Sequence, residues 1–219
     1  MDLINAITLK YLYNLKALGV DYIDILESKQ SDDSLPDDID DLRELVDSCF
    51  LCELCQTRAK TVFGEGSLSS DIMFIGEAPG AMEDYSGRPF VGRAGTLLTK
   101  MIERVLNISR SDVYIANVIK CRPPENRTPT PTEATTCKPY LLKQIEIIEP
   151  KVIVALGATA YHHLTESSAK ISHVRGKVFD FNGIYLIPTF HPSYLLRNEK
   201  AKVLAYQDLL TIKRVLCEF

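Results

Sequence analysis

Four short, strongly apolar runs separated by helical stretches constrain the fold of this 219-residue chain more than any other feature. Each run is bounded by Gly, Pro, Asn or a charge; they are DIMFIG (71–76), VYIANV (113–118), KVIVALG (151–157) and IYLIPTF (184–190). Apolar residues at helical spacing fill 93–106, 132–149, 157–164 and 198–219. Alternating strands and helices predict an α/β fold whose mostly parallel, four-stranded sheet is buried on both faces. An Asn-Gly turn in FDFNGI (179–184) predicts a hairpin into the last strand.

Polar side chains follow the predicted strands where each strand ends. Glu77 comes after the first run, Asn117 ends the second, and His191 follows the fourth. Ligands of open α/β sheets bind at the carboxyl ends of the strands. We therefore expect these three residues, although far apart in sequence, to meet at one edge of the sheet.

The N-terminal part of the chain has a different character. Residues 3–26 carry apolar residues at helical spacing and predict one or two helices. Residues 31–41 (SDDSLPDDIDD) hold six Asp and no basic residue, which predicts a polar linker. We expect residues 1–41 to be a helical and acidic accessory segment, and residues 42–219 to form the main domain.

Composition limits the location and the partners of the protein. No run of 18 apolar residues is present, and the first residues lack the basic-then-apolar pattern of a secretory signal, so we expect a cytoplasmic protein without membrane contact. The net charge of −4 argues mildly against nucleic-acid binding. The acid is concentrated in 31–41, however, while 120–127 and 175–177 are basic, and a local basic face is sufficient for binding DNA.

Six cysteines raise the question of a metal site, because disulfides are disfavoured in the cytoplasm. Cys49 and Cys52 form a C-x2-C pair, and Cys121 and Cys137 form a wider C-x15-C pair. The pattern fits a four-cysteine zinc site, an iron–sulfur cluster, or free cysteines packed as small apolar residues. Cys55 also forms a C-x2-C pair with Cys52, so spacing alone does not decide which pair binds.

The sequence from about residue 49 to 219 resembles the family 4, iron–sulfur type of uracil-DNA glycosylases. The resemblance rests on the order and spacing of several segments: V-F-G-E-G (62–66), G-E-A-P-G (76–80), E-D-Y-S-G-R-P-F-V-G-R-A-G (83–95), N-V-I-K-C-R-P-P-E-N-R (117–127), L-G-A-T-A (156–160), V-R-G-K (174–177) and F-H-P-S-Y-L-L-R-N (190–198). It implies a three-layer αβα sandwich and a structural [4Fe–4S] cluster. Counting back from V-F-G-E-G, it implies Cys49, Cys52, Cys121 and Cys137 as ligands and leaves Cys55 out.

The resemblance also implies roles around a uracil flipped out of DNA. Phe90 is expected to stack on the base, Asn117 to pair with O4 and N3–H, and His191 to donate to O2 as negative charge builds there. Glu77 is the first choice for the carboxylate that positions water or stabilises the cationic sugar, and Glu83 and Asp84 are the alternatives. Distantly related family 1 enzymes carry Asp where this chain has Ala78, so that carboxylate cannot be transferred to this chain.

Further residues are expected to line the substrate site or to bind DNA. Gly76 and Ala78 flank Glu77 in the substrate site, and Glu83 is expected near uracil C5, where it would help to exclude thymine. Leu195, or its neighbour Leu196, is expected to wedge into the space left by the flipped base. Ser193 and Arg197 are expected to contact phosphates.

The sequence analysis thus predicts an enzyme that hydrolyses the N-glycosidic bond of uracil in single- or double-stranded DNA, acting as a monomer. The alternative hypotheses are a non-catalytic DNA-binding relative with a metal-stabilised fold, and an enzyme with altered base specificity. The joint presence of Glu77, Phe90, Asn117 and His191 favours the enzyme.

Overall fold

The computed structural model describes residues 3–17 and 35–219, and in this part of the chain six strands form one sheet in the order β1-β3-β2-β4-β6-β5. The strands are β1 (Glu65–Gly66), β2 (Ile72–Gly76), β3 (Tyr114–Asn117), β4 (Val152–Leu156), β5 (Phe179–Phe181) and β6 (Ile184–Thr189). The four strands predicted from sequence are the parallel centre, β3-β2-β4-β6. The prediction of four strands in total is wrong, because β1 and β5 add antiparallel edges.

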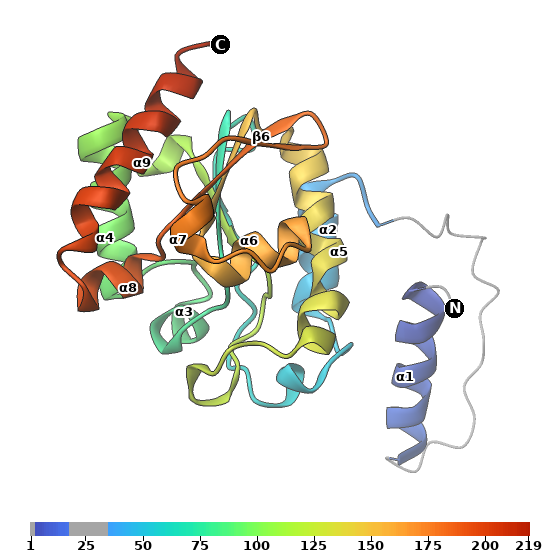
Figure 1. Cartoon of the computed structure of the whole chain (residues 1–219). Coiled ribbons are helices and arrows are strands. Elements are labelled where there is room, and N and C mark those ends of the chain that lie inside the picture. Colours follow the sequence, from blue (N-terminus) through green and yellow to red (C-terminus); the bar gives the residue numbers. More distant parts are fainter. Residues whose placement is uncertain (1–2, 18–34) are drawn as a thin grey trace.

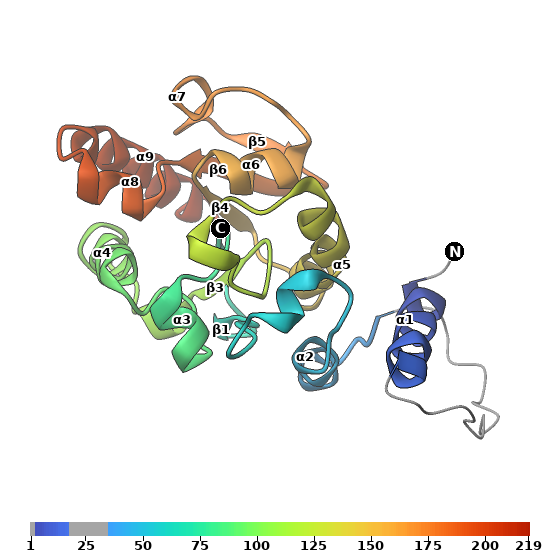
Figure 2. The same ribbon diagram turned by 90° about the horizontal axis from the view of Figure 1, so that it is seen from below.

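The described helices are α1 (Leu3–Ala17), α2 (Ile39–Asp47), α3 (Ala81–Ser86), α4 (Arg93–Met101), α5 (Pro131–Ile148), α6 (Ala158–Thr165), α7 (Ile171–Val174), α8 (Pro192–Arg197) and α9 (Ala201–Leu216). Apart from α1, the longer helices form two layers, one on each face of the sheet, as Figures 1 and 2 show. Single turns are η1 (Glu53–Gln56), η2 (Ile102–Leu106), η3 (Arg110–Asp112) and η4 (Pro124–Asn126). None of the described helices combines the length and apolarity needed to cross a bilayer.

The central strands are apolar throughout because both of their faces are covered. Side chains alternate between the faces of a strand, so Phe74 of β2 packs with α4 and α9, whereas its neighbours Met73 and Ile75 pack with α5 and α6. All five residues of β2 are buried. The predicted αβα sandwich is therefore present, with one apolar core on each side of the sheet.

The C-terminal end of the acidic stretch 31–41 is the start of a helix and not the predicted linker. Asp38 is the N-cap of α2, and its carboxylate accepts hydrogen bonds from the N–H groups of Asp40 (2.8 Å) and Asp41 (3.1 Å). Ile39 and Leu42 are buried beside Phe63. The expected domain boundary after residue 41 thus falls inside a packed helix, while residues 31–34 lie outside the described part.

Helix α1 confirms the predicted N-terminal helix over 3–17, and the rest of the predicted stretch, to residue 26, lies outside the described residues. It lies apart from the sheet in both views (Figures 1 and 2). A hydrogen bond from Lys10 Nζ to the carbonyl of Leu51 (3.2 Å) joins it to the main body.

Candidate active site

A cleft of about 370 Å³ lies at the carboxyl ends of the parallel strands. It is lined by Glu77 after β2, Asn117 at the end of β3 and His191 after β6, together with Phe90. The predicted meeting of three distant polar residues at one edge of the sheet is therefore observed. Because the carboxyl ends of parallel strands lie at the same edge of the sheet, the fold brings these residues together although they are far apart in sequence.

Asn117 presents an unpaired amide to the cleft. The residue is 1% exposed, and its main-chain carbonyl accepts a hydrogen bond from Lys120 Nζ at 2.9 Å. Its side-chain Oδ1 is buried and has no hydrogen-bond partner within the described residues. Buried polar groups are nearly always paired, so an unpaired one that lines a cleft marks a place where a ligand provides the partner.

Gly76 lets the side chains of Asn117 and Phe90 approach each other. It lies beside Asn117 in the register of β2 and β3. A Cβ at this position would collide with Asn117 Oδ1 and would lie 2.6 Å from the ring of Phe90. Only glycine leaves room for the amide and the ring on the same side of the strand.

His191 is held as a neutral donor. Its side chain is the N-cap of α8, and Nδ1 accepts the main-chain N–H of Ser193 at 3.1 Å, with Ser193 Oγ at 2.7 Å. Nδ1 must therefore be unprotonated, which places the proton of the neutral ring on Nε2. Burial, assisted by the charge of Arg197, lowers the pKa of His191 to about 4. The ring is neutral at pH 7 and has an N–H to offer a ligand.

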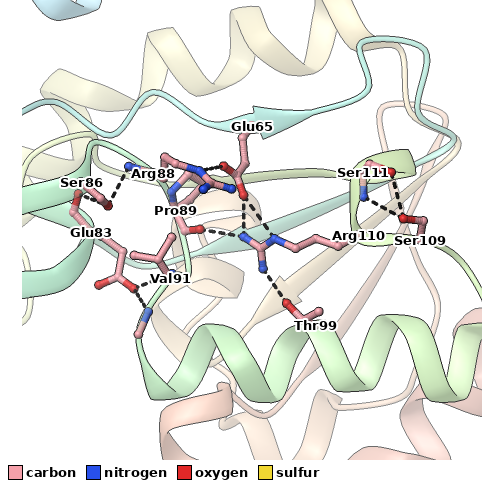
Figure 3. Close-up of polar contacts among 11 residues, drawn as sticks. Glu65, Glu83, Ser86, Arg88, Pro89, Val91, Thr99, Ser109, Arg110 and Ser111 are labelled. Atoms are coloured by element: carbon pink, nitrogen blue, oxygen red, sulfur yellow. Dashed lines mark hydrogen bonds and ion pairs between the residues drawn. The ribbon is translucent and has the colours of Figure 1, made fainter.

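Phe90 sits in a tightly held loop. Its φ of 51° lies in the left-handed region, which costs a non-glycine residue about 1–3 kcal/mol. On the C-terminal side, Glu83 Oε1 accepts the N–H groups of Val91 and Gly92, both at 2.9 Å (Figure 3). The centroid of the Phe90 ring lies 5.7 Å from that of the His191 ring. One Glu83 oxygen therefore fixes the loop, although Glu83 also lines the cleft.

The N-terminal side of the same loop is anchored by an ion-pair network that the sequence did not reveal. Arg110 Nη2 donates to the carbonyl of Pro89 (2.8 Å) and to Glu65 Oε1 (2.7 Å), and Glu65 also pairs with Arg88 at 2.8 Å (Figure 3). These two arginines lower the pKa of the Glu65 carboxyl despite its partial burial. Both flanks of Phe90 are thus held before any ligand binds.

A second, smaller cavity is lined by five of the six cysteines, Cys49, Cys52, Cys55, Cys121 and Cys137. Arg58 Nη1 donates to Cys121 Sγ at 3.2 Å, and the main-chain N–H of Lys120 donates to Cys137 Sγ at 3.3 Å. The hydroxyl of Tyr140, which also lines the cavity, is buried without a hydrogen-bond partner in the described part of the chain. Cys217 is exposed near the C-terminus.

Comparison with known proteins decides between the families that such a fold and site could represent. The model of the uracil DNA glycosylase superfamily matches residues 63–210. The chain is 56% identical over 157 residues to the type-4 uracil-DNA glycosylase of Thermotoga maritima, covering 71% of this chain and 81% of that protein. It is 44% identical over 187 residues to the type-4 enzyme of Sulfurisphaera tokodaii, covering 82% of this chain and 85% of that protein. The chain belongs to the type-4 uracil-DNA glycosylase family.

The residues expected to contact DNA in this type-4 glycosylase do not all face the cleft. Ser193 and Arg197 line it, and Arg197 is exposed. The placement of Leu195 as a wedge is contradicted, because its side chain is 1% exposed and packs in the core between the sheet, α4 and α9. Leu196, the alternative wedge, is half-buried and is not among the residues that line the cleft. The turn after His191 continues directly into α8, which directs Leu195 inward and Tyr194 outward.

The segment joining Cys121 to Cys137 forms part of the glycosylase cleft. Pro123, Asn126 and Arg127 line the wall that follows β3. Arg127 pairs with Glu133 at 2.6 Å, and Glu133 completes a capping box with Thr130 at the start of α5. The T-x-x-E spacing over 130–133 was a detectable signal for this cap. Hydrogen bonds from Arg127 lower the pKa of Glu133 to about 2.

Proposed function

We propose that this type-4 glycosylase removes uracil from DNA by hydrolysing the N-glycosidic bond. The observation that carries the proposal is the buried, unpaired Oδ1 of Asn117, set beside Phe90 and a neutral His191 in one cleft. A pyrimidine must leave the base stack to reach such a site, so the substrate is a flipped nucleotide.

Base recognition follows from the donor and acceptor pattern of an amide. Asn117 Oδ1 accepts uracil N3–H while Nδ2 donates to O4, and cytosine reverses both polarities at these positions. A site that leaves its buried polar groups unpaired with the wrong ligand discriminates strongly. Phe90 stacks on the ring. Ala78 lines the cleft without adding bulk, and Gly76 leaves room beside Asn117 and Phe90.

Bond cleavage separates charge between the sugar and the base. Water supplies oxygen to C1′, the bond from C1′ to N1 breaks, and uracil leaves with the bonding electron pair. Nε2–H of His191 donates to O2 as negative charge develops there, a role that suits a neutral imidazole held in one tautomer. Glu77, half-buried in the cleft, orients the water or stabilises the cationic sugar.

We further propose that Cys49, Cys52, Cys121 and Cys137 hold a [4Fe–4S] cluster. Two observations support the fit: N–H groups already point at two of the sulfurs, and Tyr140 has a buried hydroxyl without a partner beside them. Cys49 and Cys52 after α2, Cys121 after β3 and Cys137 in α5 would hold the cluster, which would crosslink these segments and serve structure rather than redox chemistry.

The remaining expectations belong to the same proposal. Free cysteines suit the reducing cytoplasm, which is the proposed location. The proposed partner is uracil-containing DNA, single or double stranded, bound by a monomer. Residues 42–219, extended to the start of α2, form the glycosylase domain, and the residues before α2 are accessory.

An excision assay on uracil-containing single- and double-stranded oligonucleotides tests the function. We expect the protein to leave alkali-labile abasic sites at uracil and to release far less cytosine or thymine. Glu77→Gln should reduce the rate, whereas Lys170→Gln, an exposed change away from the cleft, should not. A folded, brown preparation that binds these oligonucleotides but releases no base would overturn the proposal in favour of a non-catalytic DNA-binding relative.

A further inference from the structure

The edge of the cleft carries an exposed aromatic side chain. Tyr194 lines the cleft and remains 39% exposed, so it lies at the rim rather than at the bottom. It belongs to α8, which follows β6, whereas Asn126 and Arg127 follow β3. Because β2 and β4 lie between β3 and β6, Tyr194 and the 126–127 loop form opposite walls.

The ring of Tyr194 is fixed in place before any ligand arrives. Phe190 packs against it, with the ring centroids 5.0 Å apart and the planes 33° from parallel. Its hydroxyl accepts a hydrogen bond from Asn198 Nδ2 at 2.9 Å. One side of the ring is therefore covered, its far end is tethered, and the exposed remainder is a rigid apolar surface. Rigid aromatic anchors bind with a small loss of conformational entropy.

The surroundings of this surface suit a polyanion that carries flat rings. Arg197, one turn further along α8, is exposed and lines the same cleft. A cation beside an exposed aromatic ring is the arrangement with which proteins hold single-stranded or distorted nucleic acid, pairing the phosphate with the cation and stacking the base on the ring.

We propose that Tyr194 is the stacking platform for the base adjacent to the flipped uridine, in place of the buried Leu195. This inference rests on the proposed function, because it assumes that the cleft takes an extruded nucleotide. Phe90 contacts the uracil within the cleft, and Tyr194 meets the neighbouring base at its mouth. Stacking on one aromatic side chain corresponds to roughly 5- to 150-fold in affinity.

The experiment measures binding and excision with oligonucleotides that carry 2-aminopurine either next to the uracil or six positions away. The wild-type protein should change the fluorescence of the adjacent probe, and Tyr194→Ala should remove that change and weaken binding by about 10-fold or more. Tyr194→Phe keeps the ring and should behave almost as the wild type. Tyr206→Ala, which removes an exposed aromatic residue of α9, is the matched control and should have no effect.

Inhibition by free uracil separates stacking outside the cleft from recognition inside it. Tyr194→Ala should leave the inhibition constant unchanged, whereas Phe90→Ala should raise it. An unaltered adjacent-probe signal in Tyr194→Ala, or equal defects in Tyr194→Ala and Tyr194→Phe, would overturn the inference. If the wild type binds the oligonucleotide but releases no uracil, the proposed function fails, and the probe signal still tests the stacking.

Discussion

The cleft and the cysteine cavity each contain one buried polar atom that lacks a partner in the described part of the chain: Oδ1 of Asn117 and the hydroxyl of Tyr140. Several polar and charged side chains line the cleft, among them Glu77, Glu83 and Arg197, whereas the cavity is lined mostly by sulfur and apolar groups. A substrate comes and goes, so the cleft must keep its amide in place without help. A resident cofactor can itself hold its cavity together.

The rigid support of the cleft agrees with this difference. Lys120 donates a hydrogen bond to the main-chain carbonyl of Asn117. Arg110 and Glu83 hold the two flanks of Phe90, and Gly76 leaves room for the two side chains. In the cavity, Arg58 and the main chain of Lys120 donate hydrogen bonds to the sulfurs of Cys121 and Cys137. Lys120 therefore touches both sites, and damage at the cysteines should reach the cleft.

Cys121→Ser, in the cysteine cavity, should have the largest effect of the substitutions considered. We expect the brown colour, the bound iron and much of the fold stability to be lost, because metal-binding free energy at a structural site is folding free energy. Uracil excision should be lost with them. Cys217→Ser, at an exposed cysteine outside the cavity, is the control and should be neutral. A coloured, iron-loaded and fully stable Cys121→Ser would show that Cys121 is not a ligand.

Asn117→Asp keeps the unpaired Oδ1 of the cleft but replaces the Nδ2 donor beside it with oxygen, and it should leave the fold intact. A carboxylate cannot donate to O4, and loss of one such donor reduces turnover by about 10²- to 10³-fold. The ratio of uracil to cytosine release should also fall. Asn126→Asp, in the loop that follows β3 at the rim of the same cleft, should have a much smaller effect. Unchanged base selectivity in Asn117→Asp would remove this residue from recognition.

The titration of His191 sharpens the claim that the cleft is organised in advance. Burial lowers its pKa to about 4, so the ring should remain neutral, with the proton on Nε2, from pH 8 down to about pH 5. Since the unfolded chain protonates this histidine near pH 6.5, the free energy of unfolding should decrease as pH falls from 6.5 towards 4. Nitrogen-15 shifts of the ring, assigned with His191→Asn, measure both the tautomer and the pKa. A ring that is cationic at pH 6 would contradict the neutral-donor role.

The sequence predicted the parts of both sites that depend on local pattern. Continuous apolar runs identified the central strands, and the order of parallel strands brought Glu77, Asn117 and His191 together. The inward direction of Leu195 depends on how α8 docks on α4 and α9, which the local pattern does not record. The contact between Glu65 and Arg110 joins residues 45 positions apart, and no spacing rule predicts such a pair.

Glu133→Gln should have the smallest effect, and it tests whether the helix cap at the start of α5 stabilises the cysteine cavity. Glu133→Gln keeps the capping box at the start of α5, because an amide oxygen can still accept the N–H of Thr130, but it removes the ion pair with the exposed Arg127, which contributes little to stability. The carboxylate has its pKa lowered to about 2, so its stabilising contribution is present above about pH 4.5 and is lost as pH falls towards 2. The melting temperature of Glu133→Gln should therefore fall slightly at pH 7, and its difference from the wild type should shrink in acid. Glu166→Gln, which removes an exposed ion pair with Lys138, is the control and should change the melting temperature less.

Because Cys137 lies one turn after Glu133, faster iron loss in Glu133→Gln alone would show that the cap stabilises the cavity, and equal iron retention would show that the cysteines hold it unaided.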